Sequence, residues 1–528
     1  MLKRLAALLV VAMIGSMSLT GAHADPTIIR SYISSFDATK IVYNLFLPAD
    51  ATAANPVPII FQTHGWGGAG QASYDGFLKT LVDNDYAVIT WDQRGFGQSG
   101  GDAYVDDPGH EVRDASALID LVARRSDIQH QAPNDPVMGM IGGSYAGGIQ
   151  LALAAFDSRV DAIIPQITWH DLDYSLFPGG VQKLGFDELL YGSGLATAAS
   201  AGLGVTVGVG TKPSVQTAIP PTAGFETGNY STDLHEIEVR GTAHGYADQD
   251  TLDWFRGRSM AGYDFGHPVR VPTMLEQGST DALFNVNEAV QNLNDIAATG
   301  APVKLILFCG GHVACPGNYN QGTQGAYIAQ RQLDWFAKYL RGENVDTGAT
   351  VDYVTNDGVI HSTSAFGADA TSSTTVHGAA SLVSSGAKTS ETNGAGAQAG
   401  LSGIEAATPS DPNDPGTLTI DTGIEGGQSI VGIPTVTLNV AGVGDGAHLF
   451  FKLVDRDQNQ VIDLQEAALR VENLSTPQTI TLDMVGVAYK VPADHHIDLQ
   501  VSTSSSAMSE YRGPAVVDVD VTVSIPLL

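Results

Sequence analysis

The sequence of 528 residues predicts two folded parts, an α/β domain followed by an all-β domain. Up to about residue 342, short apolar runs alternate with segments of helical periodicity, which is typical of a parallel sheet covered on both faces. Beyond residue 342 the helical periodicity disappears, and Thr, Val, Ser and Gly alternate in short runs. A single core rarely grows past about 250–300 residues, so the length also favours two domains.

The first 24 residues have the composition of a secretory signal peptide. Lys3 and Arg4 form a basic start, the stretch 5–19 is mostly apolar, and Ala22-His23-Ala24 forms an A-x-A cleavage site. The apolar run is shorter than the ~20 residues that a membrane span needs, so we expect cleavage near Ala24 rather than a membrane anchor. The mature chain is therefore expected to be secreted, either extracellular or periplasmic.

The α/β domain is expected to cover residues 25–342. Strands are predicted at 28–33, 40–47, 58–62, 86–91, 137–141, 160–165, 272–276 and 303–308, and helices at 110–125, 149–156, 286–298 and 323–340. The interval of about 170–262 breaks the alternation and contains a Gly/Ala-rich apolar patch at 193–210. We expect a cap over the functional site there, because binding elements in such folds lie beyond the carboxyl ends of the strands. The alternative is that this interval only thickens the domain.

Residues 343–528 are expected to form an all-β domain, a β-sandwich or jelly roll. Strands are predicted at 351–354, 417–421, 435–440, 448–454, 478–483, 496–501 and 516–525, with a loop at 379–416. The stretch Asp455–Glu466 matches a calcium-binding loop at positions 1, 3, 5, 9 and 12, but Gln460 stands where that loop needs glycine. A hairpin turn is the preferred interpretation, with calcium binding as the alternative.

Charge and cysteine content limit the choice of partners. The formal net charge of −31 argues against nucleic acid or an anionic membrane surface as a partner. The only two cysteines, Cys309 and Cys315, lie close together in FCGGHVACPG, and in an oxidising compartment we expect them to form a disulfide. A zinc site is the alternative, with His312 as a third ligand. We expect no metal and no cofactor, and a small molecule or a peptide as substrate.

The stretch VMGMIGGSYAGGIQ, residues 137–150, carries the chemical signal. An apolar strand leads into a Gly-lined turn with Ser144 at its centre, and a helix follows. This is the layout of a nucleophile elbow, in which a strained turn exposes the serine hydroxyl above the sheet. The usual pattern is G-x-S-x-G; here Ala146 occupies the second glycine position, and Gly147 comes one residue later.

A nucleophilic serine needs a base and a group that orients the base. In α/β-hydrolases these follow the serine in the order acid, then histidine, on loops after later strands. Asp281 follows the strand 272–276, and His312 follows the strand 303–308, so both are expected at the edge of the sheet where the elbow opens. His170 and Asp171 are the best rivals, although the strand before them comes early for the histidine.

Acyl transfer also needs donors for the developing oxyanion. We expect the backbone N–H groups of Tyr145, the residue after the nucleophile, and of Trp66, in the loop HGWGG after an early strand. His64 is interpreted as a residue that braces this loop. Asp92 and Arg94 are predicted to form an internal ion pair near the floor of the pocket.

Several motifs together resemble the X-Pro dipeptidyl-peptidase/cocaine-esterase family of serine hydrolases. GGSYAGG looks like the family's elbow, WDQRGFGQSGG is similar to its D-x-R-G-x-G-x-S-x-G segment, and QGSTDALFN and GGH resemble its acid and histidine segments. The resemblance covers nearly the whole mature chain and implies Ser144, Asp281 and His312 as the triad. It also implies an α/β-hydrolase core, an inserted helical cap and a C-terminal jelly roll.

One departure from the family pattern bears on the substrate. The family typically places a tyrosine hydroxyl in the oxyanion hole, whereas the loop here reads HGWGG, more like that of a general esterase or lipase. We expect a dipeptidyl-peptidase-like serine hydrolase, with a carboxylesterase acting on short-chain esters, lipids or polyesters as the alternative. A further alternative, from a different class, is a non-catalytic protein that binds carbohydrate or cell wall.

Overall fold

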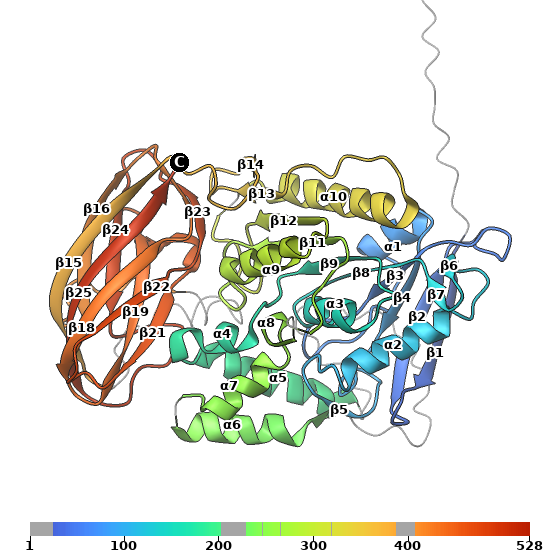
Figure 1. The fold of residues 1–528 in the computed structure, drawn as a ribbon, viewed down its shortest axis with the longest axis horizontal. Coiled ribbons are helices and arrows are strands. Elements are labelled where there is room, and N and C mark those ends of the chain that lie inside the picture. Colours follow the sequence, from blue (N-terminus) through green and yellow to red (C-terminus); the bar gives the residue numbers. More distant parts are fainter. Residues whose placement is uncertain (1–24, 202–228, 245, 264–265, 318, 387–406) are drawn as a thin grey trace, which may run out of the picture.

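The computed structural model describes residues 25–201, 229–244, 246–263, 266–317, 319–386 and 407–528. Figure 1 shows an α/β domain, a group of helices beside it and a separate β domain. The predicted signal segment, residues 1–24, lies outside the described residues. Within the described ranges, no helix combines the length and the apolar character needed to cross a membrane.

A ten-stranded sheet forms the centre of the α/β domain. Its strand order is β1-β2-β4-β3-β8-β9-β11-β12-β13-β14; the strands run parallel from β4 to β13, and the pairs toward the two edges are antiparallel. The strands are β1 (Thr27–Ser34), β2 (Lys40–Leu47), β3 (Ile59–Gln62), β4 (Ala87–Trp91), β8 (Met138–Gly143), β9 (Ala162–Gln166), β11 (Thr273–Gly278), β12 (Val303–Phe308), β13 (Val351–Val354) and β14 (Ile360–Thr363). The carboxyl ends of β8, β11 and β12, which precede the three predicted catalytic residues, therefore meet at one edge.

Helices cover both faces of this sheet. α2 (Glu111–Val122), α3 (Tyr145–Phe156) and α9 (Val286–Ala298) pack on one face, and α1 (Gly76–Asp83) and α10 (Gln321–Arg341) pack on the other (Figure 1). Helices α2, α9 and α10 each bury one stripe at helical spacing, which explains why the sequence periodicity located them, whereas α3 is buried on all sides from Tyr145 to Leu153. The short helix α1 is not among the predicted helices.

The chain between β9 and β11 forms the cap. Its described elements are α4 (Leu172–Leu176), the 3₁₀ turn η1 (Pro178–Gly180), α5 (Leu184–Ala201), β10 (Asn229–Tyr230), α6 (Thr232–His244), α7 (Gln249–Arg256) and α8 (Met260–Tyr263). These elements lie together along one side of the α/β domain, at the bottom of Figure 1. Residues 202–210 of the Gly/Ala-rich patch lie outside the described residues. Three short elements outside the cap are β5 (Asp102–Ala103), which pairs with β10, and the hairpin of β6 (His130–Ala132) with β7 (Asp135–Pro136).

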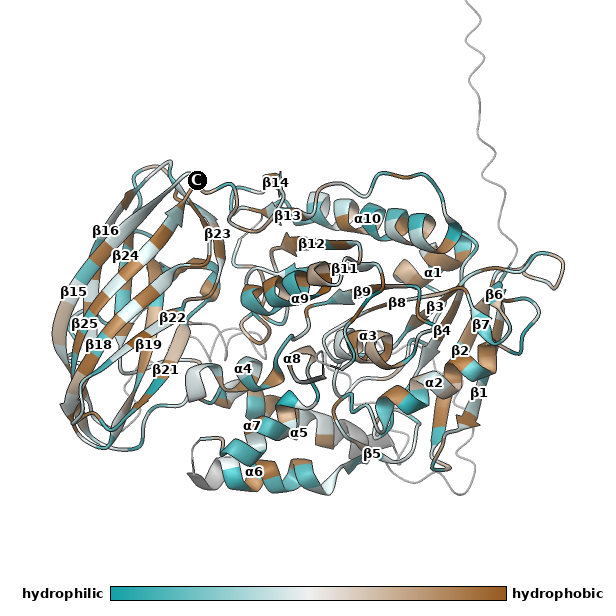
Figure 2. Cartoon of the chain, viewed as in Figure 1, coloured by the Kyte–Doolittle hydropathy of each residue, from teal (hydrophilic) through white to brown (hydrophobic). Residues whose placement is uncertain are grey.

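Two antiparallel sheets face each other in the β domain and share one core. One has the order β22-β18-β25-β17-β23 with β15 paired to β25, and the other has the order β16-β24-β19-β20 with β21 paired to β19. The strands are β15 (Ser372–Ser384), β16 (Thr417–Glu425), β17 (Ser429–Gly432), β18 (Thr435–Val443), β19 (Gly446–Asp455), β20 (Gln460–Val461), β21 (Ala467–Glu472), β22 (Gln478–Asp483), β23 (Val487–Lys490), β24 (His496–Ser502) and β25 (Ala515–Leu527), with a 3₁₀ turn η4 (Ile462–Leu464). Along β25, buried and outward-facing residues alternate, which Figure 2 shows as alternating colours.

The predicted α/β-hydrolase core followed by an all-β domain of antiparallel sheets is confirmed, but one strand belongs to a different sheet than expected. Strand β13 was predicted in the β domain, yet it pairs in parallel with β12, and β14 pairs with β13. The sheet of the α/β domain thus continues to Thr363, past the predicted boundary at 342/343. A four-residue strand that is buried along its whole length has no feature that tells which sheet it joins.

Candidate active site

Ser144 occupies a strained turn between a strand and a helix. Strand β8 ends at Gly143, helix α3 begins at Tyr145, and Ser144 between them has φ 60° and ψ −124°. A positive φ is costly for a residue with a side chain and is held here by its surroundings. The Ser144 N–H donates to the Gln166 carbonyl at 2.9 Å, and the Thr168 hydroxyl donates to the Ser144 carbonyl at 3.1 Å.

Crowding around the elbow explains why its glycines are placed as they are. A Cβ on Gly142 would lie 2.7 Å from the Cβ of Ala146, so the turn accepts alanine at 146 only while 142 is glycine. A Cβ on Gly147 would lie 2.6 Å from the Cβ of Thr168. The shift of the second glycine from position 146 to position 147 therefore follows from local packing, and the elbow keeps its conformation.

The three residues predicted as a triad lie within hydrogen-bonding distance of one another. His312 Nε2 is 2.8 Å from Ser144 Oγ, and His312 Nδ1 is 2.8 Å from Asp281 Oδ2. The carboxylate on Nδ1 favours the tautomer with its proton there, which leaves Nε2 free to accept the serine proton. Asp281 is fully buried, so its charge acts on the imidazole through a medium that screens little.

Backbone groups hold the Asp281 carboxylate in place. Its Oδ1 accepts from the N–H groups of Leu283 and Phe284 at 3.0 and 3.1 Å, and its Oδ2 also accepts from the His312 N–H at 3.1 Å. Asp281 Oδ2 thus forms hydrogen bonds with both the backbone N–H and the ring Nδ1 of His312. This arrangement fixes the distance between the two loops that carry the acid and the base.

The loop that carries His312 is closed by a disulfide. Cys309 and Cys315 are bonded, with their Cα atoms 5.3 Å apart. The Thr280 side chain connects this loop to the acid loop, because its hydroxyl donates to the Gly310 carbonyl at 3.0 Å and accepts from the Gly310 N–H at 3.1 Å. The predicted disulfide is present, and the two thiols are consequently not a zinc-binding pair.

The loop from His64 to Gly68 lies beside the nucleophile. A Cβ on Gly65 would lie 3.7 Å from the Cβ of Ser144, an ordinary van der Waals distance, so this stretch passes directly beside the nucleophile. His64 Nε2 accepts from the Gln93 N–H at 2.9 Å, its Nδ1 is 2.8 Å from the Gly65 carbonyl, and burial lowers its pKa to about 4. A neutral His64 that braces the loop agrees with the interpretation from sequence. The backbone N–H groups of Trp66 and Tyr145 stay the predicted oxyanion donors.

Ser144 opens into a largely apolar pocket between the α/β domain and the cap. The pocket has an empty volume of about 880 Å³. It is lined by Trp66, Val105, Ser144, Tyr145, Trp169, Leu172, Leu176, Phe177, Gln182, Asp187, Leu190, Tyr191, Tyr230, Leu234, Ile237, Glu238, Gly241, Ala247, Thr251, Phe255, Leu283 and Phe284. Two of these side chains, Asp187 of α5 and Glu238 of α6, are carboxylates. Sequence reasoning missed both, since the region of the cap lacks a motif that marks either of them.

The rival residues lie in other hydrogen-bond networks. His170 Nε2 is 2.7 Å from Asp295 Oδ2, and the Asp171 side chain caps α4 and lies 3.2 Å from Arg256. The predicted ion pair between Asp92 and Arg94 was wrong. Asp92 accepts the N–H groups of Gly70 and Gln98, whereas Arg94 donates to Asp114 of α2 at 2.6 and 2.8 Å. The acids nearest to Arg94 in space are therefore Asp37 and Asp114, and not the acid nearest to it in sequence.

The stretch Asp455–Glu466 forms a β-hairpin. Val454 pairs with Val461 and Asp455 pairs with Gln460, as expected for a turn between strands. The Asp455 carboxylate accepts the N–H groups of Asp457 and Gln458 at 3.1 Å and the Tyr489 hydroxyl at 2.8 Å. Among the described residues, no group of three or more His, Cys, Asp or Glu is arranged to hold a metal ion.

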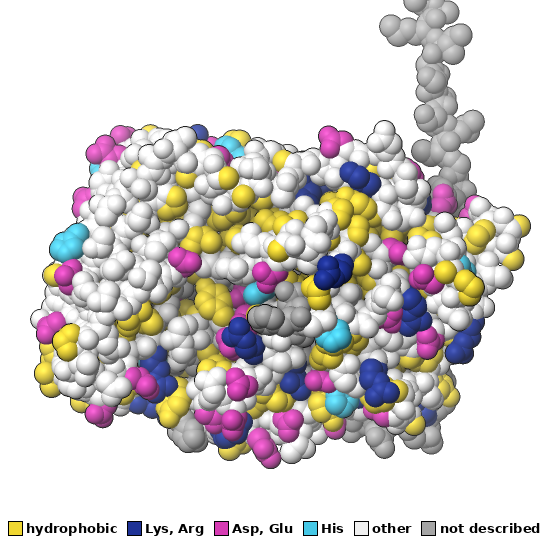
Figure 3. Space-filling model, viewed as in Figure 1, with side chains coloured by type: hydrophobic (Ala, Val, Ile, Leu, Met, Phe, Trp, Pro, Cys, Tyr) yellow, Lys and Arg dark blue, Asp and Glu magenta, His cyan; other side chains and the backbone are white. Residues whose placement is uncertain are grey.

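Acidic and basic side chains are dispersed over the face of the molecule shown in Figure 3 rather than gathered into one patch.

The fold and the arrangement at Ser144 together define an α/β hydrolase with a Ser–His–Asp site. The model of the X-Pro dipeptidyl-peptidase family (S15 family) matches residues 37–314, and the chain belongs to this family. It is therefore a hydrolase, and a serine hydrolase is consistent with the family.

Solved structures share the fold over nearly the whole chain. An α-amino acid ester hydrolase has a TM-score of 0.69 at 14% identity, covering 98% of this chain and 100% of that one. An aminopeptidase from the marine sediment archaeon Thaumarchaeota archaeon has a TM-score of 0.68 at 14% identity, covering 95% of this chain and 96% of that one. Identities this low establish the fold alone.

One curated relative matches a shorter stretch. An uncharacterised 31.7 kDa protein of Escherichia coli is 30% identical over 116 residues, which are 22% of this chain and 39% of that protein. The chain thus spans less than half the length of this relative.

Proposed function

We propose that the chain removes X-Pro dipeptides from peptides through an acyl-enzyme formed on Ser144. The hydrogen-bonded series from Ser144 to His312 to Asp281 carries the proposal, because both 2.8 Å distances suit a nucleophile, its base and the group that orients the base. Family membership supports the peptidase part of the proposal.

The reaction proceeds in two similar halves. Ser144 Oγ bonds to the carbonyl carbon while its proton moves to His312 Nε2, and the oxyanion accepts the N–H groups of Trp66 and Tyr145. When the tetrahedral intermediate collapses, the bond to the leaving amine breaks, and His312 returns the proton to that amine. Water then attacks the acyl-enzyme with the same proton transfers, which releases the dipeptide and restores Ser144. Asp281 stays ionised and stabilises the imidazolium.

The two carboxylates of the pocket support a substrate with a free amino group. Asp187 and Glu238 line a cavity whose other walls include the rings of Tyr191 and Tyr230. Carboxylates next to aromatic rings attract an ammonium group through charge and through cation–π interactions. The α-amino group of a peptide is such a cation, and the apolar remainder of the pocket suits a proline ring.

Hydrolysis of carboxylic esters is the second candidate. The loop HGWGG favours it, because Trp66 stands where the resemblance implies a tyrosine hydroxyl, and its indole N–H donates instead to the Leu190 carbonyl at 2.9 Å. The long apolar lining of the pocket would accept an acyl chain.

The two functions are separated by three substrates. We would measure kcat/KM on Ala-Pro-4-nitroanilide, on its N-acetylated form and on 4-nitrophenyl butyrate, with Ser144→Ala as control. The peptidase proposal expects turnover of the free-amine anilide and a loss of at least about tenfold for the acetylated form, the size of a lost charged hydrogen bond. Asp187→Asn or Glu238→Gln should lower the free-amine rate alone. Turnover of the ester only, unchanged in both carboxylate variants, would establish the esterase instead.

We further propose that the chain is exported and cleaved after Ala24. The basic and apolar segment at 1–24 and the Cys309–Cys315 disulfide, a bond that persists in oxidising compartments, support this. N-terminal sequencing of protein from the medium or periplasm should start at Asp25. Recovery of the full-length N-terminus from the cytoplasm alone would refute the proposal.

A further inference from the structure

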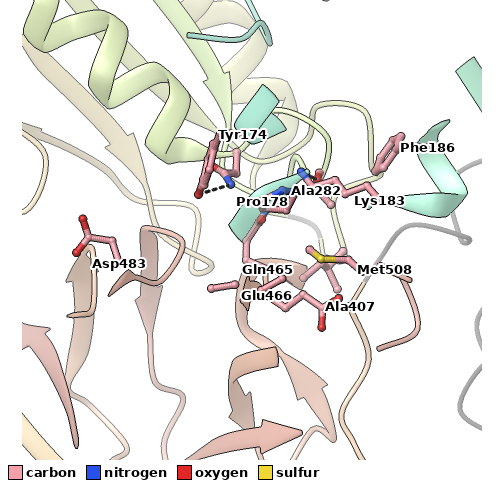
Figure 4. Close-up of a pocket in the computed structure, with 15 residues that line it drawn as sticks. Tyr174, Pro178, Lys183, Phe186, Ala282, Ala407, Gln465, Glu466, Asp483 and Met508 are labelled. Atoms are coloured by element: carbon pink, nitrogen blue, oxygen red, sulfur yellow. Dashed lines mark hydrogen bonds between the residues drawn. The ribbon is translucent and has the colours of Figure 1, made fainter. Parts of the chain in front are cut away.

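The acid loop, residues 279–284, is held from outside by two side chains that sequence motifs do not mark. Lys183, just before α5 in the cap, donates through Nζ to the carbonyls of Ala282 and Leu283 at 2.7 and 2.8 Å. Gln465, beside η4 in the β domain, donates through Nε2 to the carbonyls of Ser279 and Asp281 at 3.1 and 3.0 Å. Both donors are buried, with 3% and 5% of their surfaces exposed. Figure 4 shows Lys183, Ala282 and Gln465 where the cap, the acid loop and the β domain meet.

The contacts of Lys183 coincide with the peptide groups that hold the catalytic acid. The Ala282 carbonyl and the Leu283 N–H belong to one peptide group, and the Leu283 carbonyl and the Phe284 N–H belong to the next. Those two N–H groups donate to Asp281 Oδ1. Each peptide therefore receives a cation at its oxygen and gives a hydrogen bond to the carboxylate from its nitrogen. Hydrogen bonds in such a series polarise one another and fix the orientation of both peptide planes.

Gln465 acts on the neighbouring peptide group. The Asp281 carbonyl that it binds belongs to the peptide between Asp281 and Ala282, and the Ser279 carbonyl lies two residues earlier. These carbonyls are buried where the α/β domain meets the β domain, so without Gln465 they would lose a hydrogen-bond donor in a place that water does not readily reach. A loop relieved of these bonds could shift, and a displacement of about 1 Å at a catalytic group can cost about a hundredfold in rate.

We propose that Lys183 and Gln465 are positioning residues for Asp281, so that the cap and the β domain are both parts of the catalytic machinery. Neither side chain touches the reacting atoms. They act through the acid loop, which positions the Asp281 carboxylate relative to His312. The orientation of His312 in turn determines how well it can accept the proton of Ser144. The proposal rests on the catalytic role proposed above for the triad, and on neither candidate substrate.

The test uses the full mature chain and the kinetics of Ser144 phosphonylation by a fluorophosphonate. Lys183→Met and Gln465→Leu should each lower the limiting inactivation rate constant on the order of tenfold while changing the apparent binding constant less than about twofold. The fraction of chains labelled at the end of the reaction gives the fraction of active protein, and the rate constant is expressed per active site so that misfolded protein does not lower it. Lys183→Gln, which keeps donor groups but removes the charge, is the second variant if Lys183→Met does not fold.

A matched control breaks another contact between the same two domains. Asn287, in the first turn of α9, donates to the Met484 carbonyl at 3.0 Å and accepts from the Gly486 N–H at 2.9 Å, and neither of these bonds involves residues 279–284. Asn287→Leu should lower the melting temperature and leave the rate constant per active site within about twofold, because neither peptide that holds Asp281 is touched.

A double-mutant cycle separates positioning from general weakening of the fold. In an Asp281→Asn background, Lys183→Met should change the phosphonylation rate constant less than about twofold, because the carboxylate on which it acts is gone. Unchanged rate constants in both single variants, a change in binding alone, or an undiminished effect in the Asp281→Asn background would overturn the proposal. If Ser144→Ala is still labelled at the wild-type rate, the proposed function fails first, and the two failures are distinguishable.

Discussion

At the scale of single residues, the position of Asp281 depends on a glycine from the neighbouring loop. Gly311 has a φ of 118°, and a Cβ added to it would lie 2.5 Å from both the Cβ and Oδ2 of Asp281. A side chain there would strain the backbone and push the carboxylate away from His312. The glycine before His312 is therefore required by the acid and not only by the turn.

Gly311→Ala should lower kcat by about a hundredfold while KM stays close to wild type, since a shift of about 1 Å at a catalytic group costs that much. Steady-state kinetics of the variant check this. Gly300→Ala is the matched control, because Gly300 also has a positive φ, 82°, yet its Cβ would meet nothing within 4 Å. It should lose about 1 kcal/mol of stability and no activity. Equal activity in the two variants would refute the steric argument.

The residues that sequence reasoning located share one property: each follows a strand at the same edge of the sheet. Ser144, Asp281 and His312 could be predicted because parallel strands bring their carboxyl ends together whatever the loops contain. Lys183 and Gln465 could not, since their contacts depend on how the cap and the β domain dock. Asp187 and Glu238 were missed because the cap carries no motif that marks them.

At the scale of elements, the loop from Cys309 to Cys315 links the base to its strand. The disulfide closes this loop, and the Cys309 N–H donates to Gln324 Oε1 of α10 at 3.0 Å, so both the strand end and a helix restrain it.

Periodicity predicted the elements around the loop because their buried faces are regular. It did not predict the sheet to which β13 belongs, because strand pairing is decided by neighbours far along the chain.

Replacing both cysteines by serine should lower kcat on the order of tenfold and stability by roughly 2 kcal/mol, the chain-entropy value for so short a loop. Urea unfolding and ester or anilide kinetics of the double variant measure the two effects. Treating the wild type with a reductant should reproduce the activity loss while the circular dichroism spectrum is kept. Full activity of the reduced protein would show that the disulfide does not hold His312 in place.

At the scale of the whole molecule, several carboxylates are buried inside an acidic chain. Burial raises the pKa of Glu288 to about 8 from its ordinary 4.5, even though its side chain accepts the N–H groups of His170 and Asp171. The folded state therefore binds this proton more tightly than the unfolded state does. The resulting stability is complete below about pH 4.5 and is lost as the pH rises through about 8.

We accordingly expect the free energy of unfolding to fall between pH 5 and pH 8, and Glu288→Gln to reduce that fall by on the order of 2 kcal/mol. Glutamine keeps an acceptor for the two N–H groups but carries no charge at either pH. Urea unfolding at the two pH values measures it, with the exposed Glu425→Gln as control. An identical pH dependence in wild type and Glu288→Gln would contradict the assignment.

The role of Ser144 as the nucleophile is tested most directly by locating a covalent label. The purified mature chain would be treated with a fluorophosphonate. Its intact mass would be measured by mass spectrometry, and the labelled residue would be located by peptide mapping. We predict one adduct per chain, on the peptide that contains Ser144, absent from Ser144→Ala and formed about 10⁴-fold more slowly in Asp281→Asn. An adduct on another serine, or equal labelling of Ser144→Ala, would contradict the account.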